Sequence, residues 1–166
     1  SYIFKNCSSL ESLTLPSTIK EIESRVIEGC TKITSFTIPS GVSIISENAF
    51  SGSGLLKEFI VDQNNKYFIS GPNGELLNKK KTTLIKYPSK NPPTYYEIPE
   101  SVTIIESYAF EMNEILESIK YGGTVEPTCD DENTFSSTNS LITMIVPSQY
   151  TSSNNDFCGI PISQKY

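Results

Sequence analysis

Three short segments of the chain alternate apolar and polar residues, which is the pattern of a β-strand with one buried face. They are SLTL, SFTI and EFIV, at residues 12–15, 35–38 and 58–61. A proline follows the first two segments directly, and proline ends a strand because it has no N–H for the hydrogen-bond ladder. The pattern therefore predicts three short strands, each with one face toward a core.

These segments recur with a period of 23 residues. The same step relates many other positions, so one period governs several columns of the sequence. Four such columns are Phe4, Ile27 and Phe50; Cys7, Cys30 and Ser53; Leu10, Ile33 and Leu56; and Leu13, Phe36 and Phe59. A shared period of this length is the signature of a repeat protein, in which each unit buries its apolar face only against its neighbours.

Each unit continues in the same way after its strand. The runs VSII and VTII at 42–45 and 102–105 predict a second short strand on the opposite wall. The runs SENAF and ESYAF at 46–50 and 106–110 predict a single helical turn that buries its aromatic residue. The expected fold is thus a mainly β repeat solenoid with short helical turns. We expect one continuous interior column, made of Leu13, Phe36, Phe59 and Ile119.

The period is interrupted once. IPSGVSIISENAF at 38–50 returns as IPESVTIIESYAF at 98–110, sixty residues later, so about one and a half units have been added. The added stretch contains two β-like runs, 75–77 and 82–87, around Asn78 and a basic tip, and it predicts an inserted hairpin. The tip residues are Lys79, Lys80 and Lys81.

The pattern divides a single solenoid segment, residues 1–166, into four parts. Regular repeats fill 1–61, the hairpin insertion 62–95 and the resumed repeats 96–147, and 148–166 is predicted to be an irregular C-terminal cap. The chain begins inside a repeat and shows neither an initiator Met nor a signal peptide. We therefore expect it to be a piece of a longer protein.

Composition and charge narrow the possible partners. The net charge is −6 and the sequence pI about 4.7, and this acidic balance argues against a nucleic-acid partner. No apolar run approaches the roughly 20 residues of a membrane helix, so no membrane span is expected.

The chemistry of most catalytic and metal sites is missing. The chain has no His, which excludes a Ser–His–Asp or Cys–His arrangement and any zinc site that needs imidazole. No C-x-x-C or phosphate-binding glycine loop occurs. We expect no catalytic residue, cofactor or metal, and therefore not an enzyme. The acidic cluster at 130–132 fits a solvated loop better than a cation site.

The best candidate surface is the outward face of the strands, because alternate residues of a strand point away from the core. Such a row can offer many weak hydrogen bonds to an extended partner, although an ordinary solvated β-face has the same pattern. Its residues are Ser12, Thr14, Ser35, Thr37, Glu58, Ile60, Ser118, Lys120, Thr143 and Ile145.

Two features of the insertion are secondary candidates. The lysine tip is the one basic run of an acidic chain and could contact an acidic glycan or protein, although charge at a turn more often serves solubility. Tyr95 and Tyr96 follow the hairpin, and alternation places one of them inside and one outside.

The four cysteines form two possible pairs. Cys7 and Cys30 lie one repeat apart, where the distance allows a disulfide but parallel side-chain directions favour a stack of buried free thiols. Cys129 and Cys158 lie in the irregular end of the chain. The sequence favours a disulfide between them and a pair of free thiols equally.

These motifs resemble the BspA-like leucine-rich repeat. The likeness lies in IPSGVSIISENAFSGSGLLKEFIV and in the insertion, with its VDQNNKYF exit, TTLIKYP hairpin end and IPESV re-entry. The closing YGGTVEPTC and VPSQYTSSNNDFCG are similar to end segments of such proteins in parasitic protozoa, trichomonads in particular. The resemblance implies a right-handed leucine-rich-repeat superhelix with a parallel sheet along one face, and location on a cell surface or secretion.

The function implied by this resemblance is adhesion to host matrix, host cells or other microbes, through a protein or glycan ligand outside the cell. A structural alternative is a spacer segment of a larger surface protein, with no ligand of its own. A contiguous exposed apolar or aromatic patch would favour adhesion, and a uniformly polar surface would favour the spacer.

Overall fold

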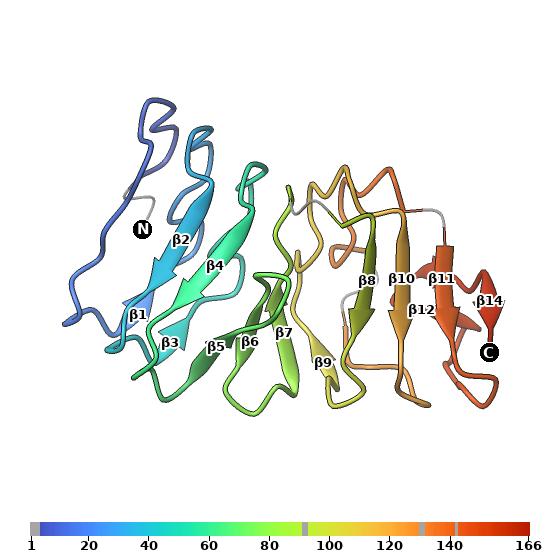
Figure 1. The fold of residues 1–166 in the computed structure, drawn as a ribbon. Coiled ribbons are helices and arrows are strands. Elements are labelled where there is room, and N and C mark those ends of the chain that lie inside the picture. The colour runs from blue at the N-terminus through green and yellow to red at the C-terminus, as the bar shows by residue number, and fades with distance from the viewer. Residues whose placement is uncertain (1–3, 91–92, 130–131, 142) are drawn as a thin grey trace.

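The repeating units stack along one axis in the computed structural model, which describes residues 4–90, 93–129, 132–141 and 143–166. One wall of the array carries parallel strands in two groups (Figure 1). The first group pairs β2 (Ser35–Ile38) with β4 (Glu58–Val61), and each residue lies opposite the one 23 positions later. The second group orders its strands β8, β10, β11 and β14. Their bounds are Tyr95–Ile98, Ser118–Tyr121, Thr143–Val146 and Gln164–Lys165.

The predicted strands at 35–38 and 58–61 are confirmed, whereas no strand forms at 12–15. Residues 12–15 make no backbone ladder with β2, and Leu13 and Leu15 are only half-buried. Among the described residues, a neighbouring unit covers these leucines on one side only.

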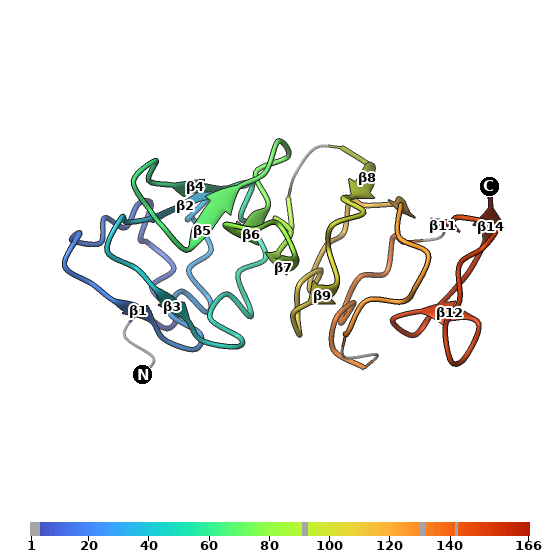
Figure 2. The same cartoon turned by 90° about the horizontal axis from the view of Figure 1, so that it is seen from below.

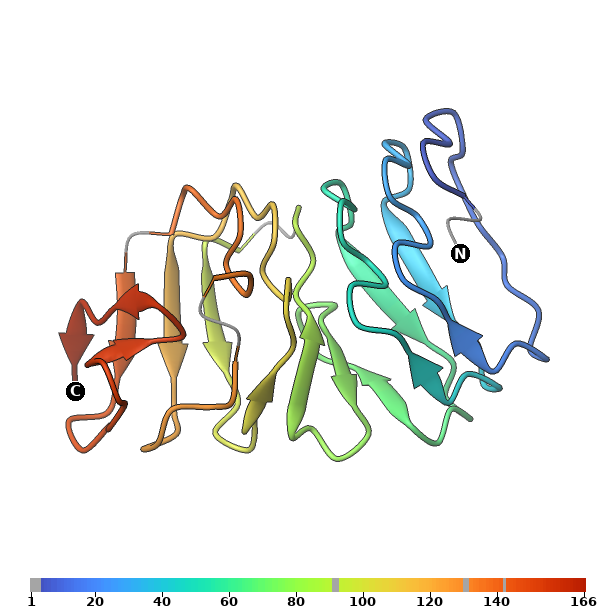
Figure 3. The same cartoon turned by 180° about the vertical axis from the view of Figure 1, so that it is seen from behind.

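The opposite wall consists of very short strands (Figure 3). β1 (Glu21–Ile22) pairs in parallel with β3 (Ile44–Ile45), and β9 (Ile104–Ile105) pairs in parallel with a strand of the insertion. The second strands predicted at 42–45 and 102–105 are therefore present but only two residues long.

The expected helical turns are wrong: the described residues contain no helix. The runs at 46–50 and 106–110 are tight turns, in which Asn48 and Tyr108 have positive φ angles of 63° and 61°. Arg25, one repeat before Asn48, has a φ angle of 55°. A left-handed residue cannot continue a right-handed helix. The turns instead bond across units, where the N–H groups of Arg25 and Val26 donate to the carbonyls of Asn48 and Ala49 at 2.9 and 3.0 Å.

The insertion forms a three-stranded antiparallel sheet that the array incorporates. The predicted hairpin is β6 (Leu76–Asn78) and β7 (Thr83–Lys86), and a third strand that the sequence analysis missed, β5 (Phe68–Ser70), pairs with β6. β7 then pairs in parallel with β9, so the sheet lies between the units before and after it (Figure 2).

The prediction of one continuous interior column is wrong. The buried residues form two clusters: Phe36 and Phe59 belong to the first, which Leu13 borders, and Ile119 belongs to the second. The column is interrupted after Phe59. The N–H of Phe59 donates to the carbonyl of Gly74 at 2.8 Å. Glu75, which follows Gly74, is 1% exposed and accepts a hydrogen bond from the hydroxyl of Tyr96. The inserted sheet therefore lies between the two cores and contributes apolar side chains to both, with Leu76 in the first and Leu77 and Leu84 in the second.

The end of the chain adds to the second group of strands. β12 (Asp156–Phe157) and β13 (Ile160–Pro161) form a short antiparallel pair, and β14 extends the parallel sheet beside β11. Phe157 is fully buried and contacts the rings of Tyr121 and Tyr150, so this segment covers the last repeat.

Candidate binding surfaces

The ten residues expected on the outward strand face all lie on the solvent side of their segments. They are exposed up to Ile60 and half-exposed from Ser118 onward. Strand register aligns them in rows, because Thr37 lies opposite Ile60 and Lys120 lies opposite Ile145. The structure therefore shows where these side chains lie, and their role in binding stays a prediction.

The sequence analysis missed the outward residues of β8 and the end of β14. Glu97 lies opposite Lys120 and forms an ion pair with it at 3.0 Å, and the hydroxyl of Tyr95 donates to Glu97 at 3.3 Å. The Lys120 ammonium also lies 4.6 Å from the ring centre of Tyr166. The alternation in YYEIP, the same as in the earlier strands, was the signal that could have placed Tyr95 and Glu97 in this row.

Tyr95 and Tyr96 separate as expected, one outside and one inside. Tyr95 is 43% exposed and Tyr96 is 1% exposed. Tyr96 packs against Tyr87 with ring centres 4.4 Å apart, beneath the inserted sheet. Burial raises the pKa of Tyr87 to about 12, and its hydroxyl has no hydrogen-bond partner among the described residues.

The three tip lysines are exposed at the turn between β6 and β7. Asn78 closes this turn, because its side-chain oxygen accepts from the N–H groups of Thr82 and Thr83 at 2.8 and 3.1 Å. The tip is thus a well-bonded turn with its charges in solvent, and nothing in the geometry gathers the ammonium groups into a site.

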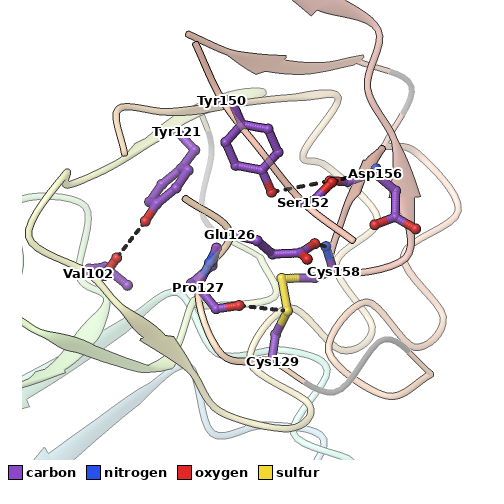
Figure 4. The surroundings of a disulfide bond; sticks show 9 residues. All are labelled: Val102, Tyr121, Glu126, Pro127, Cys129, Tyr150, Ser152, Asp156 and Cys158. Atoms are coloured by element: carbon purple, nitrogen blue, oxygen red, sulfur yellow. Dashed lines mark hydrogen bonds between the residues drawn. A yellow bond between two sulfur atoms is a disulfide. The ribbon is translucent and has the colours of Figure 1, made fainter. Parts of the chain in front are cut away.

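Cys129 and Cys158 form a disulfide, with Cα atoms 5.8 Å apart (Figure 4). The carboxylate of Glu126 lies beside it and accepts the N–H of Cys158 at 2.9 Å. Glu126 and the two sulfur atoms are close enough together to hold a metal ion. However, sulfur in a disulfide is not the thiolate that binds metals, so the arrangement is a structural one.

Cys7 and Cys30 are free thiols. Cys30 is buried and donates to the carbonyl of Phe4 at 2.9 Å, while Cys7 is half-buried. In the same column, Asn113 is fully buried, and its side chain bonds to the carbonyl of Pro88 and to two backbone N–H groups. This column therefore supplies hydrogen bonds at the turns of the array.

A buried charged pair joins the insertion to both halves. Lys86 is 3% exposed, and its ammonium donates to the carbonyl of Tyr108 at 2.6 Å and lies 3.6 Å from the Glu111 carboxylate. Glu111 in turn accepts from the hydroxyl of Ser51 and the N–H of Gly52, at 3.1 and 3.0 Å. Burial lowers the pKa of Lys86 to about 8, against the opposing effect of Glu111.

A cleft of about 190 Å³ lies next to this pair. It is lined by the turn at 45–51, by parts of β6 and β7, by Phe68 and by the turn at 106–108. Two carboxylates, Glu47 and Glu106, line it, and sequence analysis gave no signal for them because the insertion creates the cleft. Of the acidic cluster considered earlier, Asp130 and Asp131 lie outside the described residues.

Among the described residues no helix has the length and apolar character needed to cross a membrane.

Comparison with solved structures finds the same fold in bacterial proteins. A leucine-rich repeat protein from Eubacterium ventriosum is 25% identical, with a TM-score of 0.67 over 83% of this chain and 36% of its own. A leucine-rich cell surface protein from Faecalibacterium prausnitzii is 19% identical, with a TM-score of 0.61 over 100% of this chain and 62% of its own. The pneumococcal vaccine antigen PcpA is 17% identical, with a TM-score of 0.58 over 81% of this chain and 50% of its own.

The chain thus spans less than two thirds of each of these proteins. Because they are all bacterial, the expected protozoan source stays a prediction. No curated protein sequence is significantly similar to the chain.

The family model for the BspA type leucine rich repeat region matches residues 1–91 and 87–159, with six copies of the repeat. This match spans most of the chain, and the stacked parallel strands agree with it. The chain therefore belongs to the BspA-type leucine-rich-repeat family.

Proposed function

We propose that this chain is a non-catalytic binding module of a cell-surface or secreted protein, which adheres to a protein or glycan ligand outside the cell through its repeat surface. The matching structures include a cell surface protein and a vaccine antigen, which supports this location. Host matrix, host cells and other microbes are the proposed targets.

The single observation that carries the proposal is the outward face of the second group of strands. There Tyr95, Glu97 and Lys120 form a connected set, which continues toward Tyr166 and Ile145. Tyrosine contributes strongly to interfaces because its ring is large and rigid and its hydroxyl bonds to polar groups. Two exposed tyrosines, Tyr95 and Tyr166, lie on this face.

A non-catalytic role without cofactor or metal is part of the proposal. It is supported by the lack of His and by a family built as a repeat scaffold. The division into repeats at 1–61, an insertion at 62–95, resumed repeats at 96–147 and a cap at 148–166 is likewise proposed. The lysine tip is a secondary contact in this proposal.

The experiment is a binding panel of matrix proteins, host cells and glycans, measured with this chain and with variants of the outward face. We expect binding at micromolar levels and a loss of at least tenfold in Tyr95→Asp and in Lys120→Asp. The matched control is Val125→Arg, at a residue 65% exposed but outside the strands, which should bind as the unaltered chain does.

Failure to bind any member of the panel would contradict the proposal and support the structural alternative, a spacer segment without its own ligand. Equal weakening by Val125→Arg would show that the outward face is not the contact surface.

A further inference from the structure

The cleft beside Lys86 lies at a step where the bonding between units changes. Before the insertion, the N–H of Arg25 donates to the carbonyl of Asn48, and after it the N–H of Phe110 donates to the carbonyl of Thr134, each at 2.9 Å. At the insertion, the carbonyl of Tyr108 instead accepts from the side chain of Lys86. The turn at 45–51 is therefore separated from the turn at 106–108, and the cleft lies between them.

The lining of the cleft is negatively charged. Glu47 is exposed and Glu106 half-buried, and no ion pair is recorded for either carboxylate in the part of the chain that the structure describes. Burial and then the neighbouring Glu47 carboxylate raise the pKa of Glu106. Lys86 also lines the cleft, but its charge is matched by Glu111 at 3.6 Å. Two carboxylates thus remain without a cation.

The cleft also offers an unused acceptor and an apolar wall. The side-chain oxygen of Asn48 is buried and accepts no hydrogen bond within the described residues. Ile45, Phe68 and Ile85 line the same space. An N–H donor from a ligand would satisfy the Asn48 oxygen, and a chain of methylene groups would pack on the apolar residues.

We propose that this cleft receives a basic side chain, lysine or arginine, from an extended segment of a partner protein. The aliphatic stem lies against Ile45, Phe68 and Ile85, and the cationic end pairs with Glu47 and Glu106 and donates to Asn48. Charge-assisted hydrogen bonds of this kind are the strong ones. The net charge of −6 adds a long-range attraction for a basic partner.

This inference goes beyond the proposed function, because the cleft does not use the outward face of the parallel strands. If the chain bound no member of the adhesion panel, the inference about the cleft would be unaffected. The failure of the proposed function and the failure of this inference can therefore be distinguished.

The test is a titration of ¹⁵N-labelled protein with a hexalysine peptide, followed through the amide chemical shifts. We expect the largest shifts at residues 45–51 and 106–108, and affinity at least fivefold weaker in the double variant Glu47→Gln, Glu106→Gln. The matched control is Glu100→Gln, Glu117→Gln, which removes the same charge at two exposed positions elsewhere. It should bind almost as the unaltered chain does, and circular dichroism checks that both variants fold.

Three results would overturn the inference. Equal weakening in both double variants would mean non-specific attraction to an acidic surface. Equal shifts with calcium chloride alone would mean a divalent-cation site. Binding of butylammonium as tight as that of hexalysine would mean a site for small amines and not for a protein partner. A hexaglutamine peptide should leave the cleft amides unchanged.

Discussion

Asn65 shows how one polar side chain can hold a corner of the array. It is 1% exposed; its amide donates to the carbonyls of Pro39 and Val42 at 2.8 and 3.0 Å, and its oxygen accepts from the N–H groups of Tyr67 and Phe68. The side chain thus satisfies four backbone groups where the chain leaves the regular repeats. Buried backbone groups need partners, and this corner has no strand to supply them.

Replacing Asn65 by Ala should therefore lower the free energy of unfolding by roughly 3 kcal/mol, because several buried backbone groups lose their partners. Its exposed neighbour provides the matched control, and Asn64→Ala should change stability by less than about 0.5 kcal/mol. Urea unfolding followed by circular dichroism measures both. Similar effects of the two substitutions would show that the corner is held by other contacts.

At the scale of elements, the inserted sheet connects two stacks of units, and we call this connection the joint. Glu75, Lys86 and Glu111 lie between the two stacks, and each is hydrogen-bonded to a neighbouring segment, Glu75 through the hydroxyl of Tyr96. Breaking a buried ion pair leaves an uncompensated charge, whereas burying the pair already costs desolvation. The joint is therefore a place where stability depends on protonation.

We predict that Lys86 adds stability to the chain as the pH rises from about 8 to about 9.5, against an opposite contribution from Cys30, because burial raises the pKa of its thiol. Burial lowers the pKa of Lys86 from 10.5 to about 8, so in this range the unfolded chain binds a proton that the folded chain has lost. Linkage then makes the folded state more stable with increasing pH, by up to about 1.4 kcal/mol per pH unit. Above pH 10 the sign reverses, because burial raises the pKa of Tyr87 to about 12.

Urea midpoints at pH 7.5, 8.5 and 9.5 measure this dependence. In Lys86→Met the rise should disappear, and in Lys66→Met, which removes an exposed lysine, it should remain. An unchanged rise in Lys86→Met would mean that another group titrates.

At the scale of the whole molecule, the described residues form two cores, and the disulfide belongs to the second. Cys158 is part of the cluster of Phe110, Ile119 and Phe157, and Cys129 packs against it. The bond joins residues 29 positions apart. Constraining an unfolded chain over such a loop is worth roughly 3–4 kcal/mol.

The double variant Cys129→Ser, Cys158→Ser should therefore lose hydrogen-exchange protection in β10, β11 and β12, while β2 and β4 stay protected. Parts of a protein can open as separate units when few contacts connect them. Cys7→Ser, Cys30→Ser is the control and should leave the second half unchanged. Equal loss of protection in both halves would show that the two cores unfold as one.

The sequence by itself determined the repeat, the family and the places of β2, β4, β10 and β11, whereas the strand predicted at 12–15 does not form and β14 was not predicted. Phe36 and Phe59, 23 positions apart, lie opposite each other because a unit this small must bury its face on an identical neighbour. Alternation, a local property of the strand backbone, also predicted that one of Tyr95 and Tyr96 lies outside and the other inside, and the structure has Tyr95 outside. These features depend only on spacing along the chain.

Only the tertiary structure decided how the insertion divides the core. Glu75, Lys86 and Glu111 lie between 11 and 36 positions apart, and no period relates them. The two carboxylates of the cleft, Glu47 and Glu106, also occupy no common column. The turns at Asn48 and Tyr108 likewise depend on hydrogen bonds to other units, which a local pattern of apolar and polar residues does not encode. Contacts across the joint follow from how the units stack, so they arise only when the whole chain is folded.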